Sequence, residues 1–253
     1  MENDSKKIAI LVDGDNAQAK LLGNILEEVS KYGKVTIRRI YGDWTIPQMN
    51  SWKDLLNDLS FTPIQKFNYT TGKNSTDSSL IIDAMDILYG EKVDGFCIVS
   101  SDSDYTGLAK RIRESGIFVM GIGEKKTPNA FVQSCEIFTY TETLTSDDDE
   151  EEDATKTRKT TAQKGKAKKE DGKLYKKELK LIDKAFDMSV GEDDETYISV
   201  IGANLRKLNS SFDARNYGFR NLTELFRNIK TYEVIDNHKE GVKNRLVRRK
   251  SKS

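Results

Sequence analysis

Two stretches of sequence, IAILVDGDN at Ile8–Asn16 and FCIVSSDSD at Phe96–Asp104, decide the fold of this 253-residue chain. Each begins as an apolar run typical of a buried strand and ends in a turn that carries two aspartates. In an open parallel sheet, ligands bind outside the carboxyl ends of the strands. Four acids on two such turns create a region of high negative potential, and we therefore expect a cation there.

The residues around these stretches alternate between strand and helix patterns. Strands are expected at 8–12, 35–41, 61–67, 95–100 and 117–122, and helices at 17–31, 47–59, 76–89 and 105–114. Strict alternation implies a parallel sheet with helices on both faces and right-handed crossovers. The first half of the chain is therefore expected to be α/β, with a doubly wound parallel sheet.

A break in composition separates this half from the rest. Seven acids fill 147–153, and 156–169 is rich in lysine, threonine and alanine. Such segments bury too little apolar surface to offset their conformational entropy, so we expect 146–172 to be a disordered charged linker. It joins one domain at 6–145 to another at 173–250.

The second domain is expected to consist of helices followed by a hairpin. The pattern predicts helices at 173–188, 197–208 and 222–229, and β runs at 232–235 and 242–247 around a turn at 237–241. This order predicts a winged helix-turn-helix. Residues 171–253 hold 18 bases and 13 acids, whereas 1–145 hold 16 bases and 20 acids. An acidic half beside a basic half suits a metal–carboxylate domain joined to one that binds a polyanion.

Composition excludes several chemistries. The chain has one histidine, His238, and two cysteines, Cys97 and Cys135, too few for Ser-His or Cys-His catalysis or for His/Cys zinc sites. What remains is Mg²⁺ or Mn²⁺ on oxygen ligands, which usually means phosphoryl transfer or phosphodiester hydrolysis. No apolar run approaches the ~20 residues of a membrane span, and Met1–Lys7 lacks a signal-peptide core. We expect a cytoplasmic protein without membrane attachment, its cysteines reduced.

The candidate ligands are the acids that follow the two strands. Asp13 is the first residue after its strand, and Asn16 can hold Asp13, bind a metal-bound water or cap the next helix. Asp102 and Asp104 can point to one side of their turn. Capping explains Asp104 alone, because a helix begins at once, but it does not explain both acids.

A third contribution is expected from the segment before the helix at 76–89. Asp77 lies in the first turn of this helix, where the helix dipole also favours an acid. Asp83 lies about 240° around the helix from Asp77 and is a weaker alternative. Lys73 either contacts a substrate phosphate or is an exposed loop lysine.

Four blocks of sequence carry a family resemblance. They are Ile8–Asn16, Gly72–Asp86 (GKNSTDSSLIIDAMD), Val99–Leu108 (VSSDSDYTGL) and Gly116–Gly121 (GIFVMG). Together they resemble the NYN domain, the LabA-like bacterial branch of the PIN-like nucleases, over about 6–142. The resemblance implies a PIN-like, Rossmannoid fold and Mg²⁺- or Mn²⁺-dependent cleavage of RNA.

The same resemblance implies which residues act in that reaction. It assigns catalysis to Asp13, Asn16, Asp77, Asp102 and Asp104, and metal binding to the four aspartates among them. Tyr105, which follows Asp104 in the sequence, stands where the family often has phenylalanine, a mild departure from the pattern.

A second resemblance lies in the basic half. Asp213–Arg220 and Leu222–Phe226 resemble the LOTUS or OST-HTH domain over about 173–250, which implies an RNA-binding winged helix that can also bind a protein partner. Tyr217 and Phe219 can stack on unpaired bases if they are exposed; otherwise they belong to the core. The expected RNA contacts of this domain are Arg215, Tyr217, Arg220, Arg227, Arg245, Arg248 and Arg249.

These observations predict a metal-dependent ribonuclease with a tethered RNA-binding module. One alternative is a non-catalytic RNA-binding or regulatory protein whose acids bind metal without turnover. A less favoured alternative is a phosphatase that uses Asp13 and Asp15 as its nucleophile pair.

Overall fold

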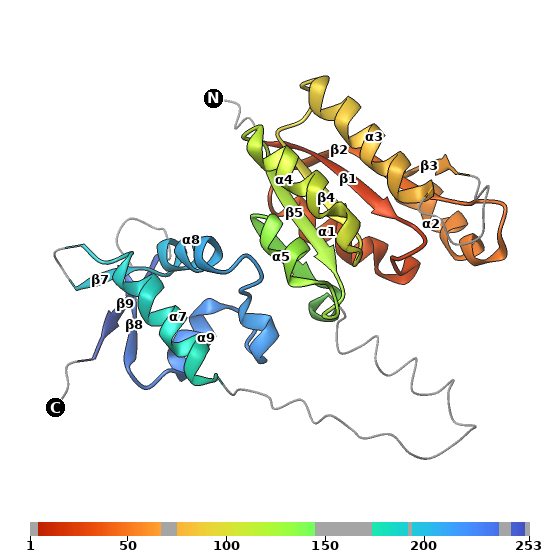
Figure 1. The fold of residues 1–253 in the computed structure, drawn as a ribbon. Helices are drawn as coiled ribbons and strands as arrows, with labels where there is room; N and C mark the ends of the chain where they lie inside the picture. The colour runs from red at the N-terminus through yellow and green to blue at the C-terminus, as the bar shows by residue number, and fades with distance from the viewer. Residues whose placement is uncertain (1–4, 67–74, 145–173, 192–193, 238–243, 251–253) are drawn as a thin grey trace, which may run out of the picture. The chain divides into compact units, whose positions relative to one another are not determined.

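The computed structural model divides the chain into two compact units, Met1–Thr157 and Arg158–Ser253 (Figure 1). The described residues are 5–66, 75–144, 174–191, 194–237 and 244–250. Lys73, the expected linker at 146–172 and nearly all of the expected turn at 237–241 lie outside them. No helix within the described ranges is long and apolar enough to span a bilayer.

A six-stranded sheet of entirely parallel strands forms the centre of the first unit. Its strands are β1 (Lys7–Asp13), β2 (Lys34–Gly42), β3 (Thr62–Gln65), β4 (Gly95–Val99), β5 (Phe118–Gly123) and β6 (Ile137–Tyr140). Their spatial order is β3-β2-β1-β4-β5-β6, so the winding direction reverses between β1 and β4. The predicted α/β fold with a parallel sheet is confirmed. The four-residue β6 was not among the expected strands.

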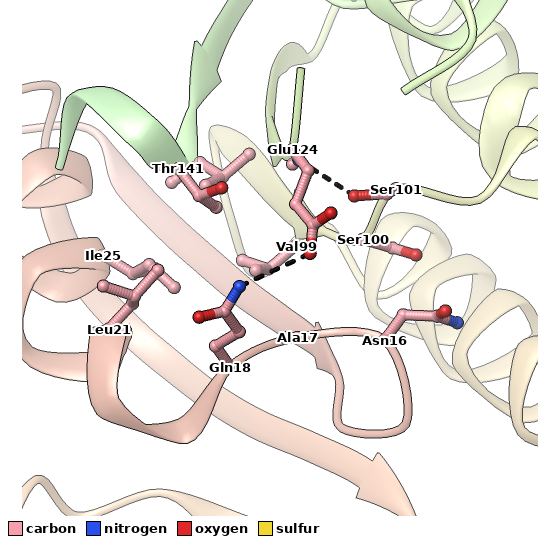
Figure 2. Close-up of a pocket in the computed structure, with 12 residues that line it drawn as sticks. Asn16, Ala17, Gln18, Leu21, Ile25, Val99, Ser100, Ser101, Glu124 and Thr141 are labelled. Carbon is pink, nitrogen blue, oxygen red and sulfur yellow. Dashed lines mark hydrogen bonds between the residues drawn. The ribbon is translucent and has the colours of Figure 1, made fainter. Parts of the chain in front are cut away.

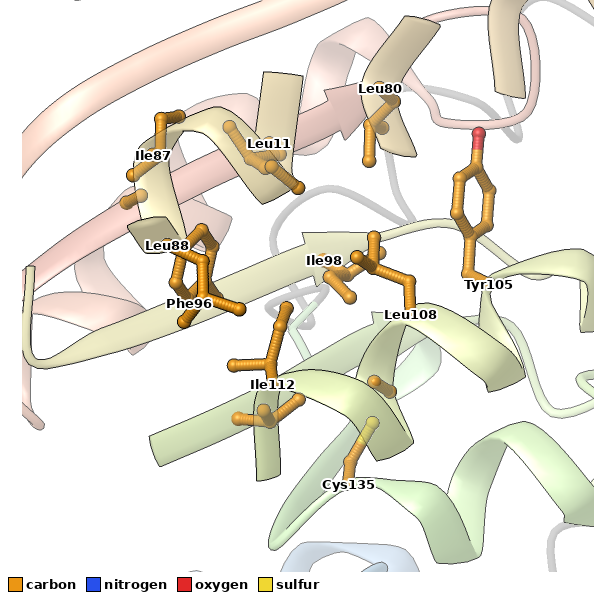
Figure 3. Packing of buried hydrophobic residues seen from close by; sticks show 14 of the residues in the cluster. Leu11, Leu80, Ile87, Leu88, Phe96, Ile98, Tyr105, Leu108, Ile112 and Cys135 are labelled. Atoms are coloured by element: carbon orange, nitrogen blue, oxygen red, sulfur yellow. The ribbon is translucent and has the colours of Figure 1, made fainter. Parts of the chain in front are cut away.

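Helices cover both faces of this sheet (Figure 1). They are α1 (Leu22–Ser30), α2 (Lys53–Asp58), α3 (Ser75–Tyr89), α4 (Thr106–Glu114) and α5 (Asn129–Ser134). One apolar layer joins α3, α4 and α5 to the sheet, and Figure 3 shows part of it. The other joins α1 and the 3-10 segment Pro47–Trp52 to the opposite face.

The alternation of side chains along β1 decides which face each residue meets. Ile8, Ile10 and Val12 pack in the layer with α1, whereas Ala9 and Leu11 pack in the layer with α3 and α4. By the same alternation, Asp13 at the end of β1 faces the α3 and α4 side. In β4 the alternation places Ser100, the residue after the strand, on that same side, because Phe96 and Ile98 pack there.

The first helix begins later than the sequence pattern predicts. The chain makes a tight turn after β1, in which the Ala17 N–H donates to the Asp13 carbonyl over 2.8 Å. Asn16 bonds to the Asp13 side chain instead of continuing a helix, so α1 starts only at Leu22. Gly14 donates its N–H to the Tyr41 carbonyl over 2.8 Å, which brings the turn close to β2.

Both cysteines are free and buried. They lie in different apolar layers, Cys97 with α1 and Cys135 with α4 and α5. Burial raises the pKa of the Cys135 thiol to about 12 and also raises the pKa of Cys97. Neither thiol is therefore a ready nucleophile at neutral pH.

In the described part of the second unit, three α-helices accompany a three-stranded antiparallel sheet of order β7-β9-β8. Its elements are α7 (Lys176–Asp187), β7 (Glu195–Tyr197), α8 (Ile198–Leu208), α9 (Leu222–Asn228), β8 (Tyr232–Asn237) and β9 (Asn244–Arg249). The three predicted helices and the antiparallel pairing of the two β runs are confirmed. The three-residue β7 was not expected, because so short a strand leaves no periodic pattern.

A cluster of aromatic rings holds this second unit together. Tyr232 packs against Phe186 and Phe226, with ring centroids 5.0 and 5.4 Å away. Its hydroxyl donates to Asp183 of α7 over 2.6 Å. The first residue of β8 is thus fixed to two helices, since Phe186 belongs to α7 and Phe226 to α9.

Replacing Gly14 with alanine tests the tightness of the turn after β1. An added Cβ would lie 2.8 Å from the Tyr41 carbonyl oxygen and 2.9 Å from Met49 Cε. Because the first neighbour is backbone, we expect Gly14→Ala to destabilise the chain by about 1–3 kcal/mol. Gly23→Ala is the matched control, because nothing lies within 4 Å of its Cβ in α1 and helical alanine stabilises by roughly 0.5–1 kcal/mol. Equal melting temperatures for the two variants would contradict the close approach.

Candidate active site

Asp13 is a fully buried carboxylate at the point where the sheet order reverses. Its Oδ2 accepts hydrogen bonds from Asn16 Nδ2 at 2.7 Å, Ser100 Oγ at 3.0 Å and the Tyr105 hydroxyl at 3.2 Å. Its Oδ1 accepts from the Asp15 N–H at 3.3 Å. A buried carboxylate needs such donors, because burying a charge without them is costly. The predicted interaction between Asn16 and Asp13 is therefore present.

Ser100 joins the two predicted carboxylate turns. Its hydroxyl donates to Asp13 and accepts from the Asp102 N–H over 3.1 Å. Asp102 follows β4 as Asp13 ends β1, and β1 pairs directly with β4. The structure thus brings together the two acidic turns that the sequence placed at one edge of the sheet.

The capping residue of the second turn is Asp102, whereas the sequence offered capping as an alternative role for Asp104. Asp102 Oδ1 accepts from the Asp104 N–H over 3.0 Å at the start of the 3-10 turn Ser103–Tyr105. A cap at Asp104 would start the helix at Tyr105, but the 3-10 turn already begins at Ser103 and leads directly into α4 at Thr106. Asp102 is half-buried and Asp104 is exposed.

The remaining predicted ligand lies at the start of α3. Asp77 belongs to the first turn of this helix, and its side chain lies outside the described part of the chain. Among the side chains that the structure does describe, no three His, Cys, Asp or Glu groups converge closely enough to hold a metal ion. The oxygen donors of Asp13 and Asp102 suit Mg²⁺ or Mn²⁺ in kind, and a further ligand is needed to complete such a site.

Asp83, the weaker alternative ligand, has another role. Its two carboxylate oxygens accept from the Arg39 guanidinium and from the Tyr41 hydroxyl, which ties α3 to β2. Burial and the Asp83 carboxylate both raise the pKa of Tyr41, so the phenol stays protonated and remains a donor. Tyr41 also stands opposite Asp13 in the β1–β2 register and accepts the Gly14 N–H. Both α3, through Asp83, and the turn after β1, through Gly14, are therefore hydrogen-bonded to Tyr41 of β2.

Glu124 is an acid at this edge that the sequence reasoning missed. It follows β5 at the carboxyl end of the sheet, so its position after a strand was the signal that could have identified it. Glu124 lines a small hollow of about 10 Å³ together with Asn16, Gln18 and Ser100. Figure 2 shows these residues around it. Lys126 Nζ lies 2.8 Å from its Oε2, and this cation lowers the pKa of Glu124.

Comparison with known proteins identifies the family to which this chain belongs. The NYN domain profile matches residues 7–144, which include both acidic turns. The chain belongs to the NYN-domain family. The profile of the OST-HTH/LOTUS domain matches residues 173–243, so an OST-HTH/LOTUS domain follows the NYN domain. NYN domains belong to the PIN-like nuclease superfamily.

One of the solved structures that match part of this chain does so at low sequence identity. It is the crystal structure of VPA0982, a protein of unknown function from Vibrio parahaemolyticus RIMD 2210633. The match has a TM-score of 0.47 and 20% identity, and it covers 55% of this chain and 95% of that one. No curated protein matches the chain significantly.

Most arginines predicted to contact RNA in the OST-HTH/LOTUS domain have carboxylate partners within it. Asp213 holds Arg215 at 2.6 Å, Asp236 lies 3.5 Å from Arg227 and 3.2 Å from Arg245, and Glu233 lies 3.2 Å from Arg248. Arg249 lies 2.8 Å from Asp187 and over the ring of Phe186. Arg220 is exposed, and its backbone N–H donates to the Glu224 carboxylate. Much of the predicted basic surface is therefore neutralised locally.

Tyr217 and Phe219, which the sequence offered either for base stacking or for the core, pack mainly in the core. Phe219 is buried, with 6% of its surface exposed. The ring of Tyr217 is half-buried and lies 5.5 Å from that of Phe212. Phe219 has no face available to a base, and Tyr217 retains only a partial one.

The pairing of Arg215 with Asp213 predicts a structural role for this arginine. Burial raises the pKa of Asp213, but Arg215 outweighs this effect and leaves that pKa below its ordinary value. The pair thus stabilises the folded domain above the ordinary Asp pKa, and this contribution disappears as pH falls through the lowered value. We expect Arg215→Gln to cost about 1–3 kcal/mol at neutral pH and less in acid.

Arg220→Gln is the control for this prediction. Arg220 is exposed, so its replacement should change stability by less than about 0.5 kcal/mol. Thermal denaturation at neutral and acid pH measures both variants. A pH-independent loss in Arg215→Gln, or equal losses in both variants, would contradict the structural role.

Proposed function

We propose that the chain is a metal-dependent ribonuclease that hydrolyses phosphodiester bonds, with the OST-HTH/LOTUS domain holding the RNA. The observation that supports this proposal is the hydrogen-bonded link between the two acidic turns. The Ser100 hydroxyl donates to Asp13 and accepts from the Asp102 backbone N–H. The membership of the first unit in the NYN family supports the reaction class. Because Cys97 and Cys135 are free thiols, we further propose a cytoplasmic location.

In this proposal Asp13, Asp77, Asp102 and Asp104 bind Mg²⁺ or Mn²⁺ at the carboxyl edge of the sheet. A bound divalent ion of this kind lowers the pKa of water and neutralises charge on a phosphate. Asn16 orients Asp13 through its amide, and Lys73 contacts a substrate phosphate. No protein general base is required.

The buried environment of Asp13 suits this role. Its Oδ2 accepts side-chain hydrogen bonds from Asn16, Ser100 and Tyr105, which hold the carboxylate in one orientation. Held this way, it presents a fixed negative charge beside the Asp102 turn. Acids gathered so closely repel one another until a cation arrives.

Two variants and a matched control test the metal site. Asp77→Asn and Asp102→Asn should each lower Mn²⁺ affinity by more than about tenfold, or ~1.4 kcal/mol, and abolish Mn²⁺-dependent cleavage of labelled RNA. The metal-free fold should be unchanged or slightly more stable, because like-charge repulsion falls. Asp86→Asn, an exposed position on the same helix as Asp77, is the matched control and should behave as wild type. Calorimetric titration that gives wild-type affinity for both Asp77→Asn and Asp102→Asn would contradict the assignment.

A non-catalytic RNA-binding protein is the second candidate, and one observation favours it. Asp13 has no exposed surface, so a metal must displace part of its hydrogen-bonded shell to reach it. This candidate predicts RNA binding with no cleavage in Mn²⁺. The phosphatase alternative is disfavoured by the same burial, because its nucleophile must reach a substrate; it predicts loss of activity in Asp15→Asn, which the ribonuclease proposal does not.

The OST-HTH/LOTUS domain supplies RNA affinity in this proposal. We propose that its three helices and the β8–β9 pair form a winged helix, with the pair as the wing. Tethering this module to the catalytic domain raises the local RNA concentration at the acidic site.

Removing residues 171–253 separates affinity from catalysis. The shortened chain should keep metal-dependent cleavage at high RNA concentration and bind RNA more weakly than the full chain, as measured by fluorescence anisotropy in EDTA. RNA binding as tight as that of the full chain would show that affinity resides in the NYN domain.

A further inference from the structure

The outer face of α7 carries four exposed lysines that the predicted RNA contacts did not include. Lys176, Lys177, Lys180 and Lys184 all point away from the core, which receives Ile182, Ala185 and Phe186 from the same helix. At helical pitch the four lysines fall within about 100° of arc. They form a basic stripe, named here the α7 lysine face, which is interrupted only at the last residue of the helix, where Asp187 falls within the same arc.

The acids of α7 do not neutralise this face. Asp183 accepts from the Tyr232 hydroxyl and lies 3.8 Å from Arg249, and Asp187 lies 2.8 Å from the same guanidinium. Both aspartates therefore pair with residues of β8 and β9. The third acid of the helix, Glu178, is half-buried and lies on the side away from the lysines. None of the four lysines pairs with a carboxylate among the residues that the structure describes.

Helix stability does not explain the arrangement. Lys176 and Lys177 occupy the first turn, where the positive end of the helix dipole disfavours cations. Lys180 lies four residues from both Lys176 and Lys184, and like charges at this spacing destabilise a helix. Lys184 lies in the last turn, where the dipole favours a cation, so the lysine face costs the helix stability at its N-terminal end, a cost that a bound polyanion would offset.

We propose that the α7 lysine face binds the phosphate backbone of single-stranded RNA. The proposal rests on the RNA-binding function proposed above and assigns it to a surface different from the β8–β9 pair. Lysines contact phosphates as mobile point charges, so the contact is independent of base sequence. Tyr175, immediately before the helix and 60% exposed, offers an aromatic ring on which a base can stack, which favours RNA over an acidic protein.

Salt dependence distinguishes this face from the arginines of the β8–β9 region. The full-length chain is titrated with a short fluorescein-labelled single-stranded RNA in EDTA, so that cleavage does not interfere. Lys180→Gln with Lys184→Gln should flatten the log–log slope of affinity against salt by about 1.4 units, since each phosphate contact on a single strand contributes roughly 0.7. The charge-matched control, Arg227→Gln with Arg248→Gln, should change the slope much less, because both arginines already pair with carboxylates.

A second readout separates function from folding. The lysine variant should melt at the same temperature as wild type or higher, whereas a structural role would lower it. An unchanged slope in the lysine variant, or a larger change in the arginine variant, overturns the proposal. Equal competition by poly-glutamate and by unlabelled RNA would also overturn it in favour of an acidic protein partner. If the wild type itself does not bind RNA, the proposed RNA-binding function fails first.

Discussion

The structure of the first unit depends on burying one charge, the carboxylate of Asp13. A fully buried carboxylate is tolerated only when donors surround it, and here the donors come from three separate places in the chain. Asn16 lies in the turn after β1, Ser100 follows β4, and Tyr105 leads into α4. Satisfying this one group therefore fixes how β1, β4 and the entry to α4 meet. The position of the acidic turns follows from that requirement.

The second unit uses its charges in the opposite way. Its acids lie next to its arginines, and these pairs stabilise the β8–β9 region and its contact with α7, with Arg249 also over the Phe186 ring. A high count of basic residues is thus a poor guide to which surface attracts RNA. What matters is which cations lack an acidic neighbour, and this property appears only when the fold brings distant residues together.

The sequence predicted the parts of the fold that local pattern controls. Alternation of apolar runs identified five of the six strands of the parallel sheet, and the shared edge of β1 and β4 brought Asp13 and Asp102 together as expected. It missed β6 and β7, which are too short to show a period. It could not foresee that Asp83 bonds to Arg39 and Tyr41, because those partners lie on another strand and no spacing rule links them. Arg215 pairs with its near neighbour Asp213, an ion pair that the sequence analysis did not predict.

Anomalous diffraction from crystals of the full-length chain grown with Mn²⁺ tests the central claim most directly. The account predicts a manganese peak within bonding distance of the Asp13 and Asp102 carboxylates, with Ser100 still bonded to the Asp102 backbone. A structure at saturating Mn²⁺ in which Asp13 keeps its bonds to Asn16, Ser100 and Tyr105, and no peak lies beside it, would contradict the claim.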